Sequence, residues 1–195
     1  MRRGRAILLT TAVAVAAVTL PAALDTPALV FWNASPSVPI GLYAAHPIDR
    51  LALGDVVVVR PAGAVAAFIV ARGYVGAGVP LLKHIAALPG QRICRDGLVI
   101  RIDGAPVAEA RERDTLGRRL PVWQGCRTVG DGDVFLLNRE AGDSLDGRYF
   151  GAVPASWIVG RAIPLWTDER GSGRFTWRAE ERPPSFPAPQ TRSIP

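Results

Sequence analysis

Apolar residues in this chain fall into short runs that glycine and proline separate. Four valines at residues 56–59 follow a Gly-Asp turn, which predicts a buried strand. Similar runs predict strands at residues 80–88, 98–102, 134–137 and 157–165. The best helical run among them is 64–72, which ends at Gly73. The pattern therefore predicts a mainly β domain with one short helix.

The N-terminal segment has a different pattern. Residues 6–24 are 19 uncharged residues that follow a basic segment, residues 1–5, and precede Asp25. A helix of that length can cross about 30 Å of hydrocarbon, and the arginines before it place the N-terminus in the cytoplasm. We expect a single transmembrane helix, with the rest of the chain exported and with Phe31 and Trp32 at the headgroups. The alternative is a cleaved signal peptide.

The remaining segments complete a chain of one domain with appendages. Residues 33–43 are rich in turn signals, and the charge-dense stretch at 108–120 is expected to form a solvated insertion. The proline-rich residues 180–195 cannot form a core and predict a disordered tail. We therefore expect one exported domain over about residues 33–170.

The amino-acid composition limits the partners, metals and cofactors that we expect for this chain. The net charge is +6, but the arginines are scattered and three of them precede the apolar segment, so we expect no nucleic-acid partner. Cys94 and Cys126 are the two cysteines, and in an exported domain they predict a disulfide. The two histidines, His46 and His84, lie in separate segments, and we interpret both as structural. We expect neither a metal nor a cofactor.

Lys83 is the only lysine among 23 basic residues. Arginine stays protonated, whereas a lysine among apolar neighbours can lose its proton and act as a base. Such a base needs a hydroxyl to activate. Ser37 is the best candidate because it lies between two prolines that stiffen its backbone, four residues before Gly41. A Ser-Lys dyad is the hypothesis, against a linker serine and a chance lysine.

Four motifs appear in order after the apolar segment: Ser-x-Pro-x-Gly-Leu-Tyr from Ser37, Arg-Gly-Tyr from Arg72, Leu-Lys before a Leu-Pro-Gly turn, and Asp-Ser-Leu-Asp-Gly-Arg-Tyr-Phe-Gly from Asp143. Over residues 33–165 this arrangement resembles the type I signal peptidase clan, peptidase family S26. It is more similar to the conjugal-transfer pilin peptidases of the TraF type. The resemblance implies a signal-peptidase-like β domain in the periplasm, behind a single-pass anchor in a bacterial inner membrane.

The same resemblance implies a role for each motif residue. Ser37 would be the nucleophile and Lys83 the general base, and Ser35 would add its hydroxyl to an oxyanion hole beside the Ser37 N–H. Ser144 would orient the lysine amine. Asp146 and Arg148 would form a supporting ion pair on one side of an extended segment. Two departures, the Ser-Val-Pro spacing and the Leu-Asn-Arg before the last motif, favour a specialised peptidase over a general one.

The expected function is a membrane-anchored serine endopeptidase that processes, and could cyclise, a conjugative pilin precursor. Its expected partners are a membrane-embedded pro-pilin or signal-peptide-bearing substrate, the lipid bilayer and mating-pair-formation components. Two alternatives stay open: a general type I signal peptidase, and a non-enzymatic envelope protein of a secretion apparatus. The sequence does not choose between water and an amine as the acceptor of the acyl group.

Overall fold

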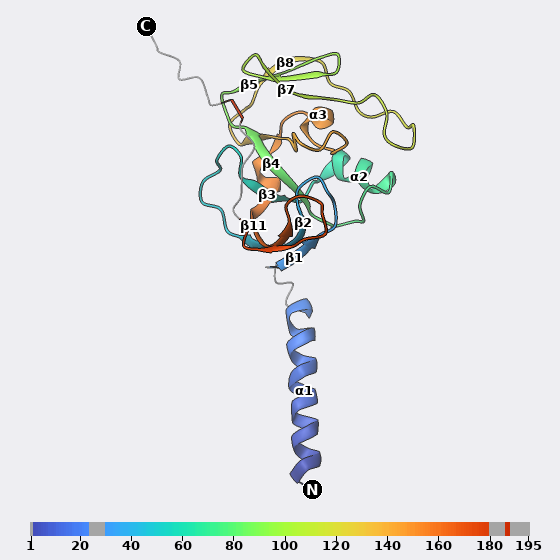
Figure 1. Cartoon of the computed structure of the whole chain (residues 1–195), viewed down its shortest axis with the longest axis vertical. Coiled ribbons are helices and arrows are strands. Elements are labelled where there is room, and N and C mark those ends of the chain that lie inside the picture. The colour runs from blue at the N-terminus through green and yellow to red at the C-terminus, as the bar shows by residue number, and fades with distance from the viewer. Residues whose placement is uncertain (1, 24–29, 180–185, 188–195) are drawn as a thin grey trace.

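The computed structural model describes residues 2–23, 30–179 and 186–187, and within them the chain is mainly β (Figure 1). The larger of two antiparallel sheets has the strand order β1-β2-β11-β3-β4-β9-β10, with β12 beside β11. Its strands are β1 (Val30–Asn33), β2 (Ile40–His46), β3 (Val56–Val59), β4 (Leu81–Ala87), β9 (Asp133–Leu136), β10 (Val153–Pro154), β11 (Ile158–Asp168) and β12 (Thr176–Trp177). The strands predicted at the four valines and around Lys83 are β3 and β4, in the middle of this sheet.

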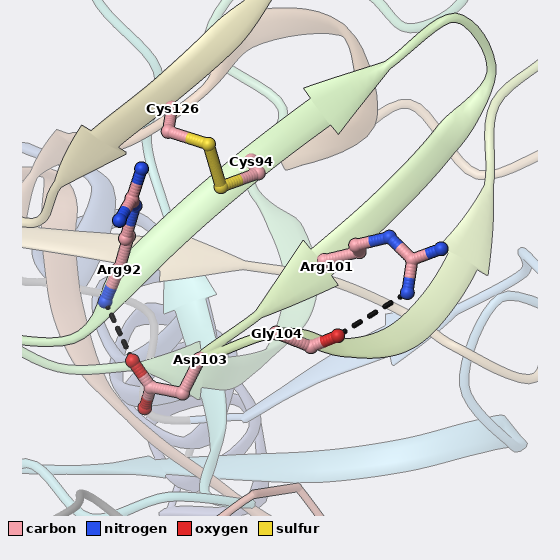
Figure 2. Close-up of a disulfide and its surroundings, with 6 residues drawn as sticks. All are labelled: Arg92, Cys94, Arg101, Asp103, Gly104 and Cys126. Atoms are coloured by element: carbon pink, nitrogen blue, oxygen red, sulfur yellow. Dashed lines mark hydrogen bonds between the residues drawn. A yellow bond between two sulfur atoms is a disulfide. The ribbon is translucent and has the colours of Figure 1, made fainter.

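The smaller sheet has the order β7-β6-β5-β8 and comprises β5 (Arg92–Asp96), β6 (Val99–Ile102), β7 (Ala105–Glu109) and β8 (Gly125–Thr128). Cys94 lies directly opposite Cys126 across β5 and β8, and a disulfide of 2.08 Å joins them (Figure 2). At the other end of the β5-β6 hairpin, the Arg92 N–H donates to the Asp103 carboxylate at 2.8 Å. These links fix the strands of a small sheet with exposed edges.

The two sheets share one core. Ile93, Ile100 and Ile102 of the smaller sheet are fully buried against Ala86 of β4 and Phe135 of β9. Because β4 belongs to the larger sheet, this contact fixes the position of Lys83 relative to the smaller sheet. The strand that carries the candidate base therefore also contacts the smaller sheet.

In the part of the chain that the structure describes, four helical segments accompany the sheets: α1 (Arg2–Ala23), α2 (Gly63–Ala71), α3 (Gly147–Phe150) and a 3-10 turn (Ala155–Trp157). The predicted helix at 64–72 is α2, and the prediction of one short helix missed α3 and the 3-10 turn. Among the residues whose placement is described, no helix is both long enough and apolar enough to span a membrane.

The opening at residues 33–43 was predicted as turns, and this is wrong beyond residue 39. There β2 begins, and it pairs with β1 on one side and β11 on the other. Gly41 makes the second pairing possible: its φ is 153°, and a Cβ at this position would collide with the Trp166 carbonyl. Partners distant in sequence thus override a local turn pattern.

The insertion at residues 108–120 is not simply solvated. Ala110 and Leu120 are buried, and the Arg118 guanidinium donates to the Arg72 carbonyl at 3.0 Å, which ties the insertion to the end of α2. The predicted disordered tail lies outside the described residues except for Phe186 and Pro187. Phe186 packs against the core under the smaller sheet.

Candidate active site

A cavity of about 530 Å³ brings together residues that are far apart in the sequence. Its wall includes the loop between β1 and β2, the segment from the end of α2 into β4, the insertion that follows β7 and the turn before α3. Four of the predicted site residues line it: Ser35, Ser37, Lys83 and Ser144. The insertion contributes Arg111 and Arg113, which sequence reasoning assigned only to solvent.

Lys83 lies in the middle of β4, opposite Val57 of the neighbouring strand β3, and its side chain is buried. Its Nζ donates a hydrogen bond of 2.6 Å to the Ser144 hydroxyl. Burial lowers the pKa of Lys83 from 10.5 to about 8; Asp146 opposes this change and Arg148 adds to it. An amine with this pKa is partly neutral near pH 7 and can accept a proton.

Ser37 and Ser35 form a hydroxyl pair that also lines the cavity. The Ser35 hydroxyl donates to the Ser37 Oγ at 3.1 Å, and the Ser37 N–H reaches the Ser35 Oγ at 3.4 Å. Among the described residues no hydrogen bond joins Ser37 to Lys83. The nucleophile and base candidates therefore share one cavity, and each is hydrogen-bonded to another serine.

Asp146 and Arg148 form an ion pair that solvent does not reach, with 2.9 Å between Arg148 Nη2 and Asp146 Oδ2. They do not lie on one side of an extended segment, as the i, i+2 spacing suggested. Asp146 is the N-cap of α3, and it accepts a hydrogen bond from the Arg148 N–H as well as from the guanidinium. Burial alone would lower the pKa of Arg148, but its bonds to Asp146 raise it. The helix start, and not an extended backbone, brings the pair together.

Gly147 explains how this turn fits against the sheet. A Cβ at Gly147 would lie 2.7 Å from the Leu136 carbonyl of β9, and it would also collide with the Phe135 ring. A side chain there would push the Asp146 cap away from β9. The glycine in the last motif is therefore required for packing.

Asn138 is a buried residue whose role the sequence reasoning missed. Its Nδ2 donates to the Leu82 carbonyl at 3.0 Å, and its Oδ1 accepts from the His84 N–H at 3.1 Å. The side chain thus pairs with the two peptide groups that flank Lys83, where β9 has already ended. Its own N–H donates to Asp146 at 3.0 Å. Asn138 therefore connects the strand of the candidate base to the buried ion pair.

His84 sits beside this network and is not one of the residues that line the cavity. Its Nδ1 lies 3.1 Å from Asn138 Oδ1, and burial lowers its pKa. An amide oxygen can only accept, so Nδ1 carries the hydrogen. In the part of the chain that the structure describes, no group of three or more His, Cys, Asp or Glu side chains could hold a metal ion.

The arrangement can carry out proton transfer and acyl transfer. A buried amine and a serine hydroxyl face one cavity that is large enough for several peptide residues, and the Ser35 hydroxyl lies beside the serine N–H. Those are the groups that nucleophilic attack on a carbonyl requires.

Comparison with known proteins agrees with the motifs. The family model described as signal peptidase, peptidase S26, matches residues 3–166. The conjugal transfer protein TraF of Agrobacterium tumefaciens (strain 15955) is 35% identical over 188 residues, which is 86% of this chain and 98% of that protein. The plasmid transfer protein TraF of Escherichia coli is 30% identical over 146 residues, 69% of this chain and 81% of that protein.

Two further matches are to proteins named signal peptidase I. A probable signal peptidase I-1 of Synechocystis is 30% identical over 62% of this chain and 56% of that protein. A solved signal peptidase I from Enterococcus faecalis V583 is 18% identical over 58% of this chain and 97% of that chain, with a TM-score of 0.36. The family match covers most of the chain, and the TraF relatives match over most of their own length. This chain belongs to the signal peptidase family, peptidase S26, and its homologues include TraF conjugal transfer proteins.

Proposed function

We propose that this protein is a membrane-anchored serine endopeptidase in which Ser37 is the nucleophile and Lys83 the general base, and that it processes a conjugative pilin precursor. One observation carries the proposal. The buried amine of Lys83, with a pKa of about 8, lines the same cavity as Ser37. Burying a lysine is costly, so a chain that keeps one beside a serine has a use for the neutral amine.

The proposed reaction starts when substrate enters the cavity and Lys83 is neutral. Lys83 Nζ takes the proton of the Ser37 hydroxyl as Ser37 Oγ attacks the scissile carbonyl. The Ser37 N–H and the Ser35 hydroxyl, which turns away from Ser37 Oγ, stabilise the oxyanion. The ammonium of Lys83 then gives its proton to the leaving amine, and the C–N bond breaks to leave an acyl-enzyme.

The second half of the reaction repeats these roles. With water as acceptor, Lys83 takes one proton from the water as its oxygen attacks the ester, and returns a proton to Ser37 Oγ. The product is then a cleaved peptide. With the substrate's own terminal amine as acceptor, the same steps close a new peptide bond and give a cyclic product. Ser144 supports both halves because it holds the lysine amine at 2.6 Å.

The proposed substrate class follows from the relatives, which are named conjugal transfer and plasmid transfer proteins. Mating-pair-formation components are the proposed partners in the envelope. We assign no nucleic-acid partner, since the arginines of this chain are scattered.

The proposed location is the periplasmic face of the inner membrane, with the N-terminal apolar segment as the anchor. An exposed aromatic cluster supports it: Trp32, Trp166 and Trp177 are 50%, 44% and 63% exposed. Trp32 and Trp166 contact each other, and Phe175 packs against both. Tryptophans exposed in this way are typical of membrane interfaces. Trp32 also lines the cavity, so a substrate held in the bilayer could reach Ser37.

The test uses the full chain in detergent with two substrates, a pro-pilin and a generic signal-peptide precursor. We expect pro-pilin cleavage, and labelling by an inhibitor that acylates serines, both of which are lost in Ser37→Ala and in Lys83→Ala. The matched control is Ser156→Ala, because Ser156 is exposed in the 3-10 turn away from the cavity. Preferred cleavage of the signal-peptide precursor would support a general signal peptidase instead. Labelling that persists in Ser37→Ala would refute the dyad.

A further inference from the structure

Asn33 ends strand β1, and its side chain turns into the loop that carries Ser37. Its Nδ2 lies 2.7 Å from the Ser35 carbonyl, 3.2 Å from the Val38 carbonyl and 3.1 Å from the Pro39 carbonyl. Its Oδ1 accepts from the Ser35 N–H at 3.1 Å. One amide thus contacts backbone groups on both sides of Ser37. The orientation of the amide is fixed, because the flipped form would place an oxygen against three carbonyl oxygens.

The loop needs these hydrogen bonds because its prolines remove others. Pro36 and Pro39 stiffen the backbone but carry no N–H, so the loop has few donors of its own for carbonyls that point inward. Asn33 supplies two N–H groups to three carbonyls, so at least one N–H is shared. The loop is also held by the buried Val38 side chain.

Ser37 itself receives no contact from Asn33. Within the described residues its N–H makes only the long 3.4 Å contact to the Ser35 hydroxyl, so it is available to a developing oxyanion. The contacts of Asn33 go to the residues before and after Ser37, and they fix where the Ser37 N–H and hydroxyl lie relative to the cavity. With no hydrogen bond between Ser37 and Lys83, this loop geometry has to set the distance between them.

We propose that Asn33 is a positioning residue that holds the nucleophile loop in its reactive geometry. The proposal rests on the peptidase function proposed above. Asn33 does not touch the reacting atoms. Its effect is on the placement of Ser37, where a displacement of about 1 Å can cost about 10²-fold in rate.

Two substitutions test different parts of this contact. Asn33→Asp keeps the shape and the acceptor for the Ser35 N–H but replaces the donor by a carboxylate oxygen, which three carbonyls repel. Asn33→Ala removes both. We expect kcat to fall about 10²-fold in Asn33→Ala and at least as far in Asn33→Asp. KM should change less than about threefold, because Asn33 forms only a small part of the cavity wall and its amide is bonded to the loop.

The matched control is Gln124→Glu, also an amide-to-carboxylate change. Gln124 is exposed and donates to the Gly97 carbonyl at 3.3 Å, near the smaller sheet and outside the cavity lining. Its turnover should equal that of the unmodified chain.

Hydrogen exchange gives a second readout that turnover cannot give. In both Asn33 variants the loop amides of Ser35, Ser37, Val38 and Ile40 should exchange about tenfold faster, while those of β4 stay unchanged. The same measurement in a Ser37→Ala background needs no catalysis. If the unmodified chain and Ser37→Ala turned over substrate equally, the peptidase proposal would fail, and exchange would still decide whether Asn33 holds the loop.

Several results would overturn the proposal: kcat within about threefold of the unmodified chain, a loss confined to KM, or a lower kcat without faster exchange at residues 35–40. Unfolding of both variants, with faster exchange in β4 as well, would also overturn it, since Asn33 would then support the whole fold and not this loop.

Discussion

Lys83 allows a quantitative prediction about pH and stability. A pKa of about 8 in the folded chain, against 10.5 for a solvated lysine, corresponds to about 3 kcal/mol lost when the charged amine is buried. Below pH 8 both the folded and the unfolded chain carry the proton, so the full cost is present. Between pH 8 and 10.5 the unfolded chain keeps a proton that the folded chain has released, and stability therefore rises with pH.

Lys83→Met removes the charge and keeps an unbranched side chain that can fill the same space. We expect it to raise the free energy of unfolding by about 3 kcal/mol at pH 7, by about 1 kcal/mol at pH 9.5 and by almost nothing above pH 11. Urea unfolding of the full chain in detergent, with the disulfide intact, measures this difference. An Arg60→Met control replaces an exposed cation, and its effect should not vary with pH. If the gain in unfolding free energy of Lys83→Met stayed constant or grew between pH 7 and 9.5, burial would not be what lowers the pKa of Lys83.

Under the proposed mechanism, the same titration of Lys83 should govern turnover. Only about one tenth of the Lys83 amine is neutral at pH 7, so kcat/KM should rise with pH and level off above about pH 8. Lys83→Met should be inactive although it is more stable. Lys83→Arg should be equally inactive, because the guanidinium does not release its proton in this range. Near-full turnover by Lys83→Arg would end the dyad interpretation.

Three further predictions concern the stability of the turn beside the site and of the smaller sheet. Arg148→Ala leaves the Asp146 carboxylate buried without its ion pair, and denaturant unfolding at pH 7 should show a loss of about 3–5 kcal/mol; a loss under 1 kcal/mol would contradict the buried pair. Gly147→Ala should cost about 1–3 kcal/mol by the same measurement, because its methyl group collides with β9, and a variant as stable as the parent would show that the turn relaxes freely. The Cys94–Cys126 disulfide closes a loop of 32 residues and should contribute about 3–4 kcal/mol, so reduction should lower the unfolding midpoint; free thiols at both positions in protein purified without reductant would contradict the bond.

Local patterns in the sequence predicted the central strands well. The four valines form β3, which is covered on both faces and bordered by two strands, so a continuous apolar run was sufficient. The apolar neighbours of Lys83 predicted that its strand would be buried, and the structure buries the amine too. The order of the motifs was also sufficient to indicate the family. These features depend on residues close together in the chain.

The missed features depend on residues that meet only in the fold. β2 was predicted as turns because its strand state is stabilised by pairing with β11, more than 100 residues later. No local pattern marks Asn138 or Asn33, because the sequence around an asparagine that completes a hydrogen-bond ladder looks like the sequence around a loop asparagine. The Asp146–Arg148 pair was predicted, but its geometry was not, because the cap of α3 depends on how the turn packs against β9.

The amino-acid sequence alone was enough to show which groups could react: one lysine in an apolar run, and one serine between prolines. Only the fold places them in one cavity, because β4 and the β1-β2 loop are brought together by pairing through β3 and β11. The fold also lowers the pKa of Lys83 to about 8, because the amine leaves water only when β4 has paired with β3 and the turn that carries Ser144 has packed against it.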